Sequence, residues 1–372
     1  MKILYIAPGN NPHTWKWVGW FGEKYPGEIS LIPYYDDVPD GVLDNVSILR
    51  PIIPQYKIAA LTGSIKNRVK KLVHDNNPDI LHALWAYGSG TYAAWTNFSP
   101  FILSPWGSDV TVFPYRKGVK GNIQKKLVVE ALRTADYVTA TSRYLYHQIE
   151  QLVPKIKELK LFPYGVDTSI FDSYKVPDKI KFSWPAGRAD VIVGMFKNLE
   201  STYGPDLLIE ALAKALKQNP GIRCVIGGDG SLRAELEKQA KDLGVSEYIV
   251  FTGQIPYLSM PRYLASIDIF VMPSRYEVFG VAALEASSMK LPVIISKKWG
   301  MIETAVDNVT GLFFEPENVD DLTAKIIKLA GNGELRNKFG LAGRKFVQEN
   351  YEFDSIMNKA DEYCRNILET SR

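Results

Sequence analysis

Two acidic residues, Glu277 and Glu285, lie on either side of an apolar strip that contains Phe279 and Gly280. The strip follows an expected strand at 267–272, and the pattern predicts that a helix begins near Gly280. The start of a helix presents unpaired N–H groups and the positive end of the helix dipole to an anion. This stretch therefore predicts a phosphate-binding site with a carboxylate on each side.

The spacing of the two glutamates indicates what such a site would bind. Eight residues of helix advance about 12 Å, so Glu277 and Glu285 would contact different parts of one elongated ligand. Two carboxylates that act across one bond would lie about 5 to 9 Å apart. The spacing favours a diphosphate with hydroxyl-rich ends, such as a nucleotide sugar, because carboxylates accept hydrogen bonds from hydroxyl groups. From spacing alone, two glutamates on an ordinary amphipathic helix remain the alternative.

The elements that must position these residues are two series of short apolar runs that alternate with helical patterns. Such runs are typical of strands that are buried on both faces of a parallel sheet. We expect strands at 3–7, 29–33, 80–83, 101–104, 137–140 and 159–162 in the first series, and at 191–196, 223–226, 249–252, 267–272, 292–296 and 312–315 in the second. Each series predicts an α/β domain with a doubly wound sheet.

The length of the chain agrees with two domains, because 372 residues are too many for one ordinary core and fit two domains of about 180 residues. We expect the first domain at 1–176 and the second at 177–352. The linker is expected at 172–189, which contains three turn-forming Pro and Gly residues and no clear periodicity. Ligands of parallel sheets bind beyond the carboxyl ends of the strands, so two such domains facing each other would form a site in the cleft between them.

The composition is that of a globular protein, with 46% hydrophobic and 23% charged residues. No segment reaches the roughly 18 uncharged apolar residues of a membrane span. The chain goes from Met1 directly into an expected strand, which leaves no room for a signal peptide, so we expect a cytoplasmic protein. Cys224 and Cys364 stand in unrelated segments without ligand-like neighbours, so neither a disulfide scaffold nor a zinc site is indicated.

Positive charge is concentrated in the first half of the chain, where 20 basic residues face 15 acidic ones in 1–175, against 24 and 26 in the remainder. Two groups of basic residues can be interpreted in two ways. They are either solvated helix faces or surfaces that hold the protein on anionic lipids at the inner face of the cell membrane. No nucleic-acid partner is expected. The groups are Lys66, Arg68, Lys70 and Lys71, and Lys117, Lys120, Lys125 and Lys126.

Two absences narrow the class of reaction. No two aspartates lie two positions apart, so the Asp-x-Asp motif with which many transferases bind a divalent ion is missing, and we expect no metal and no cofactor. The first expected strand is followed by Pro-Gly-Asn-Asn at 8–11, without the Gly-x-Gly-x-x-Gly fingerprint. This argues against a nicotinamide-dependent dehydrogenase.

The run from Glu277 to Glu285 matches, position for position, the Glu-x-Phe-Gly-x4-Glu signature of a known family. Four other segments match its motifs in the same order, at 135–142, 163–171, 227–230, and 300–303 with 310–312. The chain therefore resembles the retaining GT-B glycosyltransferases of glycosyltransferase family 4.

This resemblance implies a GT-B fold, in which two doubly wound Rossmann-like domains face an interdomain cleft. It also implies a metal-independent, retaining enzyme that transfers a sugar from a nucleoside-diphosphate sugar to a hydroxyl acceptor, which could be a glycan, a lipid-linked molecule or a small molecule. The first domain would bind the acceptor and the second the donor. A C-terminal helix at about 353–372 would pack back on the first domain.

The family's motifs assign roles to individual residues. Lys197, directly after the expected strand 191–196, would take the place of an arginine, while Tyr203 stands where the family usually has a lysine. One cation of the usual pair is thus lost, and the charge of the leaving diphosphate would fall to Lys197, the helix start, and Arg275 or Lys298. Catalytic roles are implied for Glu277, Lys197, Asp109 and His13, and donor binding for Gly228, Gly230, Ile255, Phe279, Gly280, Val281 and Glu285.

Acceptor binding would fall to the aromatic first half, where six of the eight tryptophans lie within residues 1–106. Aromatic faces stack on the apolar faces of sugars. We expect His13 and Trp15 in a loop at 11–17, and Trp106 where the family has a histidine. The implied acceptor-binding residues are Trp15, His82, Tyr87 and Trp106. Two alternatives stay open: an epimerase that acts on a free nucleotide sugar, and a nucleotide-sugar-binding protein without catalysis.

Overall fold

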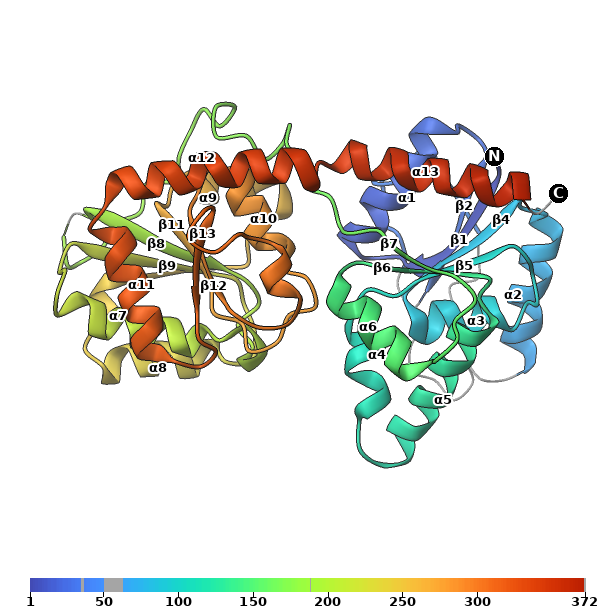
Figure 1. The fold of residues 1–372 in the computed structure, drawn as a ribbon, viewed down its shortest axis with the longest axis horizontal. Helices are drawn as coiled ribbons and strands as arrows, with labels where there is room; N and C mark the ends of the chain where they lie inside the picture. Colours follow the sequence, from blue (N-terminus) through green and yellow to red (C-terminus); the bar gives the residue numbers. More distant parts are fainter. Residues whose placement is uncertain (35–36, 50–62, 188, 371–372) are drawn as a thin grey trace. The chain divides into compact units, whose positions relative to one another are not determined.

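The computed structural model describes residues 1–34, 37–49, 63–187 and 189–370. The chain forms two compact units (Figure 1). Unit 1 contains Met1–Pro163 together with the C-terminal segment that begins at Ser355. Unit 2 contains Tyr164–Asp354.

Unit 1 is built on a seven-stranded parallel sheet in the order β3-β2-β1-β4-β5-β6-β7. The central strands are buried on both faces, which explains their continuous apolar sequences. The strands are β1 (Ile3–Pro8), β2 (Ile29–Tyr34), β3 (Ser47–Ile48), β4 (Ile80–Leu84), β5 (Phe101–Ser104), β6 (Tyr137–Ala140) and β7 (Leu159–Leu161). The helices are α1 (Pro12–Lys24), α2 (Gly63–Asn76), α3 (Thr91–Ala94), α4 (Ser108–Thr111), α5 (Gly118–Thr134), α6 (Arg143–Leu152) and α13 (Phe353–Thr370).

Unit 2 repeats this architecture with a six-stranded parallel sheet in the order β10-β9-β8-β11-β12-β13. Its strands are β8 (Val191–Phe196), β9 (Ile222–Gly227), β10 (Ile249–Gly253), β11 (Ile269–Met272), β12 (Val293–Ser296) and β13 (Gly311–Phe314). Its helices are α7 (Pro205–Leu216), α8 (Arg233–Asp242), α9 (Met260–Leu264), α10 (Val281–Ser288), α11 (Val319–Ala330) and α12 (Gly333–Asn350). Figure 1 shows α7 and α8 on one face of this sheet and α12 on the other.

The predicted α/β class with two doubly wound parallel sheets is confirmed. Each of the twelve predicted strands is present, with ends that differ by at most a few residues. The short strand β3 was not predicted because two residues, Ser47 and Ile48, are too few to show an alternating or apolar pattern. The order of the strands in each sheet also could not be predicted from apolar runs, which carry no information on neighbours.

The boundary between the units lies at Tyr164, earlier than the expected boundary at 176/177. Within the segment that was expected as a linker or as the end of the first domain, Val166, Phe171 and Trp184 are buried in the core of unit 2. Asp172 forms an ion pair of 3.1 Å with Arg344 of α12. The expected linker 172–189, described here except for residue 188, lacks periodicity because it is irregular chain that packs on unit 2.

The last helix, α13, belongs to unit 1 and lies beside α1 (Figure 1). Asp361 of α13 is buried, where it accepts a hydrogen bond of 2.6 Å from the Tyr25 hydroxyl and pairs with Lys24 at 3.0 Å. Tyr363 donates a hydrogen bond of 2.9 Å to Glu158. Unit 1 is therefore completed by residues from the opposite end of the chain.

Two further predictions from composition concern the membrane and the thiols. Among the described residues, no helix has both the length and the apolar character that crossing a bilayer requires. Cys224 and Cys364 are free thiols buried in unit 2 and unit 1, and burial raises the pKa of both. Neither thiol is therefore exposed as a nucleophile.

Candidate functional site

The loop between β11 and α10 has the strand-loop-helix form that the sequence predicts. Gly280 caps the start of α10 with a φ of +99°, in the left-handed region that favours glycine. A Cβ atom there would lie 2.8 Å from Cε of Met272. The turn thus needs glycine for both conformation and space, and it directs the start of α10, with Val281 as first residue, to the carboxyl edge of the sheet.

Glu277 in this loop forms an ion pair of 2.9 Å with Lys197, which directly follows β8. The pairing of β8 with β11 brings these two residues together. Their side chains are only 20% and 18% exposed. Burial by itself lowers the pKa of Lys197, but the charges of Glu277, Tyr203 and Glu285 and the hydrogen bond to Glu277 outweigh it and raise that pKa above its ordinary value. Lys197 is therefore a stable ammonium.

The second glutamate, Glu285, acts on the same group from α10. Its negative charge contributes to the raised pKa of Lys197. It also contributes to the raised pKa of the Tyr257 hydroxyl, for which burial is the larger cause and a hydrogen bond to Glu285 a further one. The negative charges of Glu277 and Glu285 thus both stabilise the charged form of Lys197, and Tyr257 is a neighbour of Glu285 that sequence reasoning missed.

A pocket of about 240 Å³ in unit 2 adjoins this charged group. The ring of Tyr203 lies 4.6 Å from Nζ of Lys197, so the residue in the place of the family's lysine makes a cation–π contact with the remaining cation. Three predicted site residues, Lys197, Gly228 and Ile255, therefore lie together. The pocket is lined by Phe196, Lys197, Asn198, Tyr203, Gly227, Gly228, Gln254, Ile255 and Met260.

Two of the three glycines at 227–230, Gly228 and Gly230, are required by close contact between loops. A Cβ atom at Gly228, where φ is +124°, would lie 1.9 Å from the carbonyl oxygen of Lys197. At Gly230 it would lie 2.5 Å from that of Leu199. The glycines let the loop after β9 pack on the loop that carries Lys197, and Gly230 serves this packing while Gly228 also lines the pocket.

The side chain of Phe279, a residue predicted to bind the donor, points into the core of unit 2. Phe279 is buried in the core of unit 2, with ring centroids 5.6 Å from Tyr351 and 6.5 Å from Tyr164. An apolar ring beside a glycine turn fits either a ligand contact or a core contact, and the sequence does not distinguish them. Phe279 therefore packs the start of α10 against the core of unit 2.

Arg275, which the sequence suggested as a cation for the diphosphate, is instead bound to the carboxylate of Asp206. Its guanidinium donates hydrogen bonds of 2.8 and 2.6 Å to the two carboxylate oxygens of Asp206 and one of 2.8 Å to the Ser201 carbonyl. The indole of Trp299 donates to the Arg275 carbonyl at 3.0 Å. These contacts tie the chain just before Glu277 to the start of α7, and neither Asp206 nor Trp299 has a sequence signal for this role.

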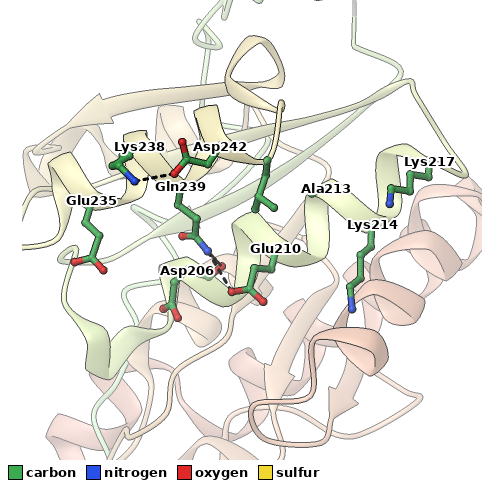
Figure 2. Close-up of a pocket in the computed structure, with 10 residues that line it drawn as sticks. Asp206, Glu210, Ala213, Lys214, Lys217, Glu235, Lys238, Gln239 and Asp242 are labelled. Carbon is green, nitrogen blue, oxygen red and sulfur yellow. Dashed lines mark hydrogen bonds and ion pairs between the residues drawn. The ribbon is translucent and has the colours of Figure 1, made fainter.

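A second pocket of unit 2, of about 710 Å³, lies between α7 and α8 and contains none of the predicted site residues (Figure 2). Its charged side chains are largely paired, as Lys238 with Asp242 at 2.9 Å and Gln239 with Glu210 at 3.3 Å. Lys214 on its rim pairs with Asp320 at 2.5 Å. Several charged side chains around this pocket are thus held by neighbours, and the predicted donor-site residues line the other pocket of unit 2.

In unit 1, the segment 11–17 is the start of α1 and not a loop as expected. Asn11 caps the helix by accepting a hydrogen bond of 2.8 Å from the His13 amide, and Pro12 is the first helical residue. Asparagine followed by proline is a helix-start signal that could have been recognised in the sequence. Trp15 is half-buried and donates from its indole to the Gly9 carbonyl at 2.8 Å.

His13, Trp106, Trp85, Phe113 and Tyr87 form a continuous chain of half-buried rings, which we name the aromatic cluster. Successive ring centroids are 5.9, 6.0, 5.8 and 5.7 Å apart in edge-to-face arrangements. Trp85 has a φ of 90°, which non-glycine residues rarely adopt and which is common at functional sites. The fold thus brings together three predicted residues and adds two that were missed.

The structure corrects the acceptor-binding role of His82. Its ring is 2% exposed, and Nε2 lies 2.7 Å from Oγ of Ser104 inside unit 1. Burial lowers the pKa of His82 from 6.5 to about 3, so the ring is neutral. The sequence places His82 at the end of an expected strand, but it does not show that this strand, β4, lies in the centre of the sheet and is covered on both faces.

The structure also corrects the catalytic role of Asp109. Its carboxylate is fully buried and accepts hydrogen bonds from the amides of Gly107 at 2.8 Å, Trp106 at 3.2 Å and Ala86 at 2.5 Å. Burial raises the pKa of Asp109 to about 6, although these amide bonds act in the opposite direction. Asp109 is therefore a positioning residue that holds the two loops of the aromatic cluster together.

His82 and Asp109 have opposite effects on the pH dependence of stability. The contribution of His82, whose pKa is depressed, is present above its ordinary value of 6.5 and is lost as the pH falls toward 3. The contribution of Asp109, whose pKa is raised from 3.8, is present below that value and is lost as the pH rises through 6. Each group changes the free energy of unfolding by about 1.4 kcal/mol per pH unit, with opposite signs. Between about pH 4 and pH 6 the two contributions therefore nearly cancel.

Single substitutions should expose each slope. In Asp109→Asn, the free energy of unfolding of unit 1 is expected to fall by about 1 kcal/mol as the pH is lowered from about 6 to about 5, and in His82→Gln it should rise by about as much. Urea denaturation followed by tryptophan fluorescence measures this, because six of the eight tryptophans lie in unit 1. Parallel slopes in both variants and the unmodified protein would contradict the assignment.

The chain has the two Rossmann-like units of a GT-B protein. The second unit carries the Glu-x-Phe-Gly-x4-Glu loop beside a lysine at the end of a strand. Residues 2–142 match the family described as glycosyl transferase 4-like, and residues 177–346 match glycosyl transferases group 1. The chain belongs to the group 1 glycosyltransferases of the family 4 type.

Known proteins of this kind resemble the chain in sequence and in fold. It is 31% identical over 231 residues to the GDP-mannose-dependent alpha-(1-6)-phosphatidylinositol monomannoside mannosyltransferase of Mycolicibacterium smegmatis, a match covering 59% of each chain. The chain thus aligns with about three fifths of this curated relative. Sucrose-phosphate synthase of Thermosynechococcus elongatus has a TM-score of 0.81 at 18% identity over 100% of both chains. Anabaena HepE in complex with UDP has a TM-score of 0.79 at 17% identity, over 98% of this chain and 100% of HepE.

Proposed function

We propose that this protein transfers a sugar from a nucleoside-diphosphate sugar to a hydroxyl acceptor, with retention of configuration and without a metal ion. The observation that carries this proposal is the ammonium of Lys197 beside Glu277 and Glu285, next to the start of α10. A diphosphate would find a fixed cation and unpaired helix N–H groups there. The mannosyltransferase relative is named as GDP-mannose-dependent, which supports a donor of this class.

Each group of this site has a defined part in the proposed reaction. Lys197 offsets the negative charge that develops on the leaving diphosphate. Glu277 accepts hydrogen bonds from hydroxyls of the donor sugar, for which its ion pair with Lys197 must open or be shared. Glu285 accepts hydrogen bonds from the ribose hydroxyls and is held by Tyr257.

The bond changes follow from this placement. The bond between the anomeric carbon and the diphosphate oxygen breaks, and the acceptor oxygen bonds to the same carbon on the same face. The acceptor hydroxyl passes its proton to an oxygen of the leaving phosphate. No side-chain nucleophile takes part, so the protein contributes position and charge.

The aromatic cluster of unit 1 is proposed to bind the acceptor. Its half-buried rings offer apolar faces of the kind that stack on sugars, and His13 adds a ring nitrogen for a hydroxyl group. The acceptor of the mannosyltransferase relative is named as a phosphatidylinositol monomannoside, which supports a lipid-linked acceptor here. We propose that the reaction takes place in the cytoplasm.

A thermal-shift screen tests donor binding and identifies the base. One nucleotide sugar among UDP-, GDP- and ADP-linked sugars is expected to stabilise the protein by about 2.7 kcal/mol at about 100 times its Kd. For a unit of this size, the midpoint of unfolding should rise by about 5 to 11 °C, because each kcal/mol of stabilisation shifts it by about 2 to 4 °C. The matched control is the corresponding free sugar 1-phosphate, which should give no shift. Absence of a shift with every nucleotide sugar would contradict the proposal.

The second candidate is a protein that binds a nucleotide sugar without turning it over. Tyr203 in place of the family's lysine favours it, because one cation of the usual pair is then missing from the site of the leaving group. Calorimetric binding of the donor with neither hydrolysis nor transfer would identify this function. Conversion of the donor sugar in the absence of any acceptor would instead identify an epimerase.

A further inference from the structure

One surface of unit 1 exposes apolar side chains beside a group of cations. It comprises residues 112–126, which span the short 3-10 turn η3 (Phe113–Tyr115) and the first half of α5, and we name it the η3–α5 surface. Tyr115 is 54% exposed, Val119 76% and Ile123 46%. Figure 1 shows this segment at the end of unit 1 that is opposite to α13.

The helix geometry separates these exposed side chains from the core. Gly121, Gln124 and Val128 are buried on the inner face of α5. With 3.6 residues per turn, Val119, Ile123 and Lys126 lie on the opposite face. The exposed apolar residues are therefore not covered by unit 1, and a cation stands in line with them.

The charged residues within this stretch of the sequence all have one sign. No acidic residue occurs between Asp109 and Glu130, a stretch with five cations. Tyr115 and Phe113 each lie against a cation, with Lys125 Nζ 5.8 Å from the Tyr115 ring and the Arg116 guanidinium 4.1 Å from the Phe113 ring. The five cations are Arg116, Lys117, Lys120, Lys125 and Lys126.

We propose that the η3–α5 surface binds the surface of an anionic lipid bilayer. Exposed aromatic and β-branched residues that enter the headgroup region, with lysines directed to the lipid phosphates, are the combination by which helices lie in a membrane interface. A protein partner would satisfy the apolar residues, and a nucleic acid the cations, but a bilayer of anionic lipids satisfies both. The positive charge of this surface, together with its exposed apolar residues, thus favours an anionic lipid bilayer as the binding partner.

The other basic group of unit 1 lacks the apolar part of this combination. In α2, Val69 and Val73 are fully buried, so the apolar residues beside Lys70 and Lys71 face the core. Lys71 also pairs with Asp75 at 3.3 Å. The sequence showed two similar basic groups, and burial distinguishes them.

The η3–α5 surface is continuous with the aromatic cluster, because Phe113 belongs to the cluster and contacts Arg116. Docking on a bilayer would bring a lipid-linked acceptor to the cluster from the membrane side. This last step rests on the proposed function, whereas binding to the bilayer does not. The two can therefore be tested separately.

Co-sedimentation of the full chain with vesicles tests the proposal. The protein is expected to pellet with vesicles of phosphatidylcholine containing about 30% phosphatidylglycerol at about 0.05 M NaCl, and to be released at about 0.5 M NaCl. With phosphatidylcholine alone it should stay in the supernatant. Failure to pellet with the anionic vesicles at low salt would overturn the proposal.

Two variants locate the binding on the η3–α5 surface. Lys125→Gln with Lys126→Gln should weaken partitioning about 30-fold, the equivalent of roughly 1 kcal/mol for each charge. Val119→Ser with Ile123→Ser, which removes no charge, should weaken it about 10-fold. The matched control is Lys70→Gln with Lys71→Gln in α2, which should change partitioning by less than about 3-fold.

Equal losses in the α2 control and in the Lys125/Lys126 variant would show that net charge alone drives binding, and would overturn the proposal. The proposal would also be overturned if the Val119/Ile123 variant partitions like the unmodified protein. A preference of the protein for RNA or heparin over anionic vesicles, measured in direct competition, would overturn it as well. Donor-induced thermal shifts should be unchanged in all three variants. Vesicle binding without any donor shift would leave the docking surface intact and reject the proposed function.

Discussion

Replacing Lys197 by methionine is expected to lower the turnover number for sugar transfer by about 100- to 1000-fold, which is the usual cost of removing a group that stabilises a developing oxyanion. The effect should be at the high end of that range, because Tyr203 stands where the family usually has a second cation. Methionine keeps the length and apolar stem of the side chain, so the loss reports the charge. Initial rates at saturating donor measure it.

Two further variants make the Lys197 result specific. Lys197→Arg keeps a cation at the position where the family has an arginine, and it should recover most of the turnover. Lys298→Met removes the other lysine considered for this role, whose Nζ lies 4.8 Å from the ring centroid of Trp299, and it should retain nearly full turnover. Unchanged turnover in Lys197→Met, or a large loss in Lys298→Met alone, would assign the charge stabilisation to another group.

Replacing Glu285 by glutamine should raise the Michaelis constant for the donor by about 100-fold, with a much smaller change in the turnover number. Hydrogen bonds to a charged group contribute about 1.5 to 3 kcal/mol each, and an amide in the same place keeps the volume but loses the charge. The ribose is remote from the reacting bond, so the lost interaction is present equally in the ground state and in the transition state. Initial rates over a range of donor concentrations separate the two constants.

The control for Glu285 is Glu235→Gln on α8, an exposed glutamate that lines the pocket of Figure 2. Its donor Michaelis constant should equal that of the unmodified protein. A wild-type donor constant in Glu285→Gln would remove this residue from the ribose. A rise in Glu235→Gln would instead move the nucleotide to the pocket between α7 and α8.

The ion pair between Lys197 and Glu277 explains how this site can be stable before a ligand binds. A lysine buried among apolar residues would lose its proton, but here carboxylates keep the ammonium charged. Removing either partner leaves an uncompensated charge, so Glu277→Ala and Lys197→Met are each expected to affect the fold as well as the reaction. The turnover numbers of Lys197→Met and Glu285→Gln are therefore to be compared per amount of folded protein, with the unfolding midpoint measured for each variant.

Local features could be predicted from the sequence because their causes are local. Continuous apolar runs predicted the strands, since strands covered on both faces need apolar residues at each position. The run Phe279-Gly280 predicted the start of α10, since a positive φ at Gly280 requires glycine. The order of strand ends placed Lys197 at the carboxyl edge of its sheet, and the spacing of Glu277 and Glu285 indicated an elongated ligand.

The sequence by itself therefore determined the fold class, the strands and the residue types at the candidate donor site. The tertiary structure decided which of these side chains are accessible: His82, Asp109 and Phe279 are buried, and Arg275 is held by Asp206. It also decided which residues meet, as in the aromatic cluster. The physical reason is that burial, ion pairing and pKa depend on neighbours far away along the chain, which periodicity and spacing do not specify.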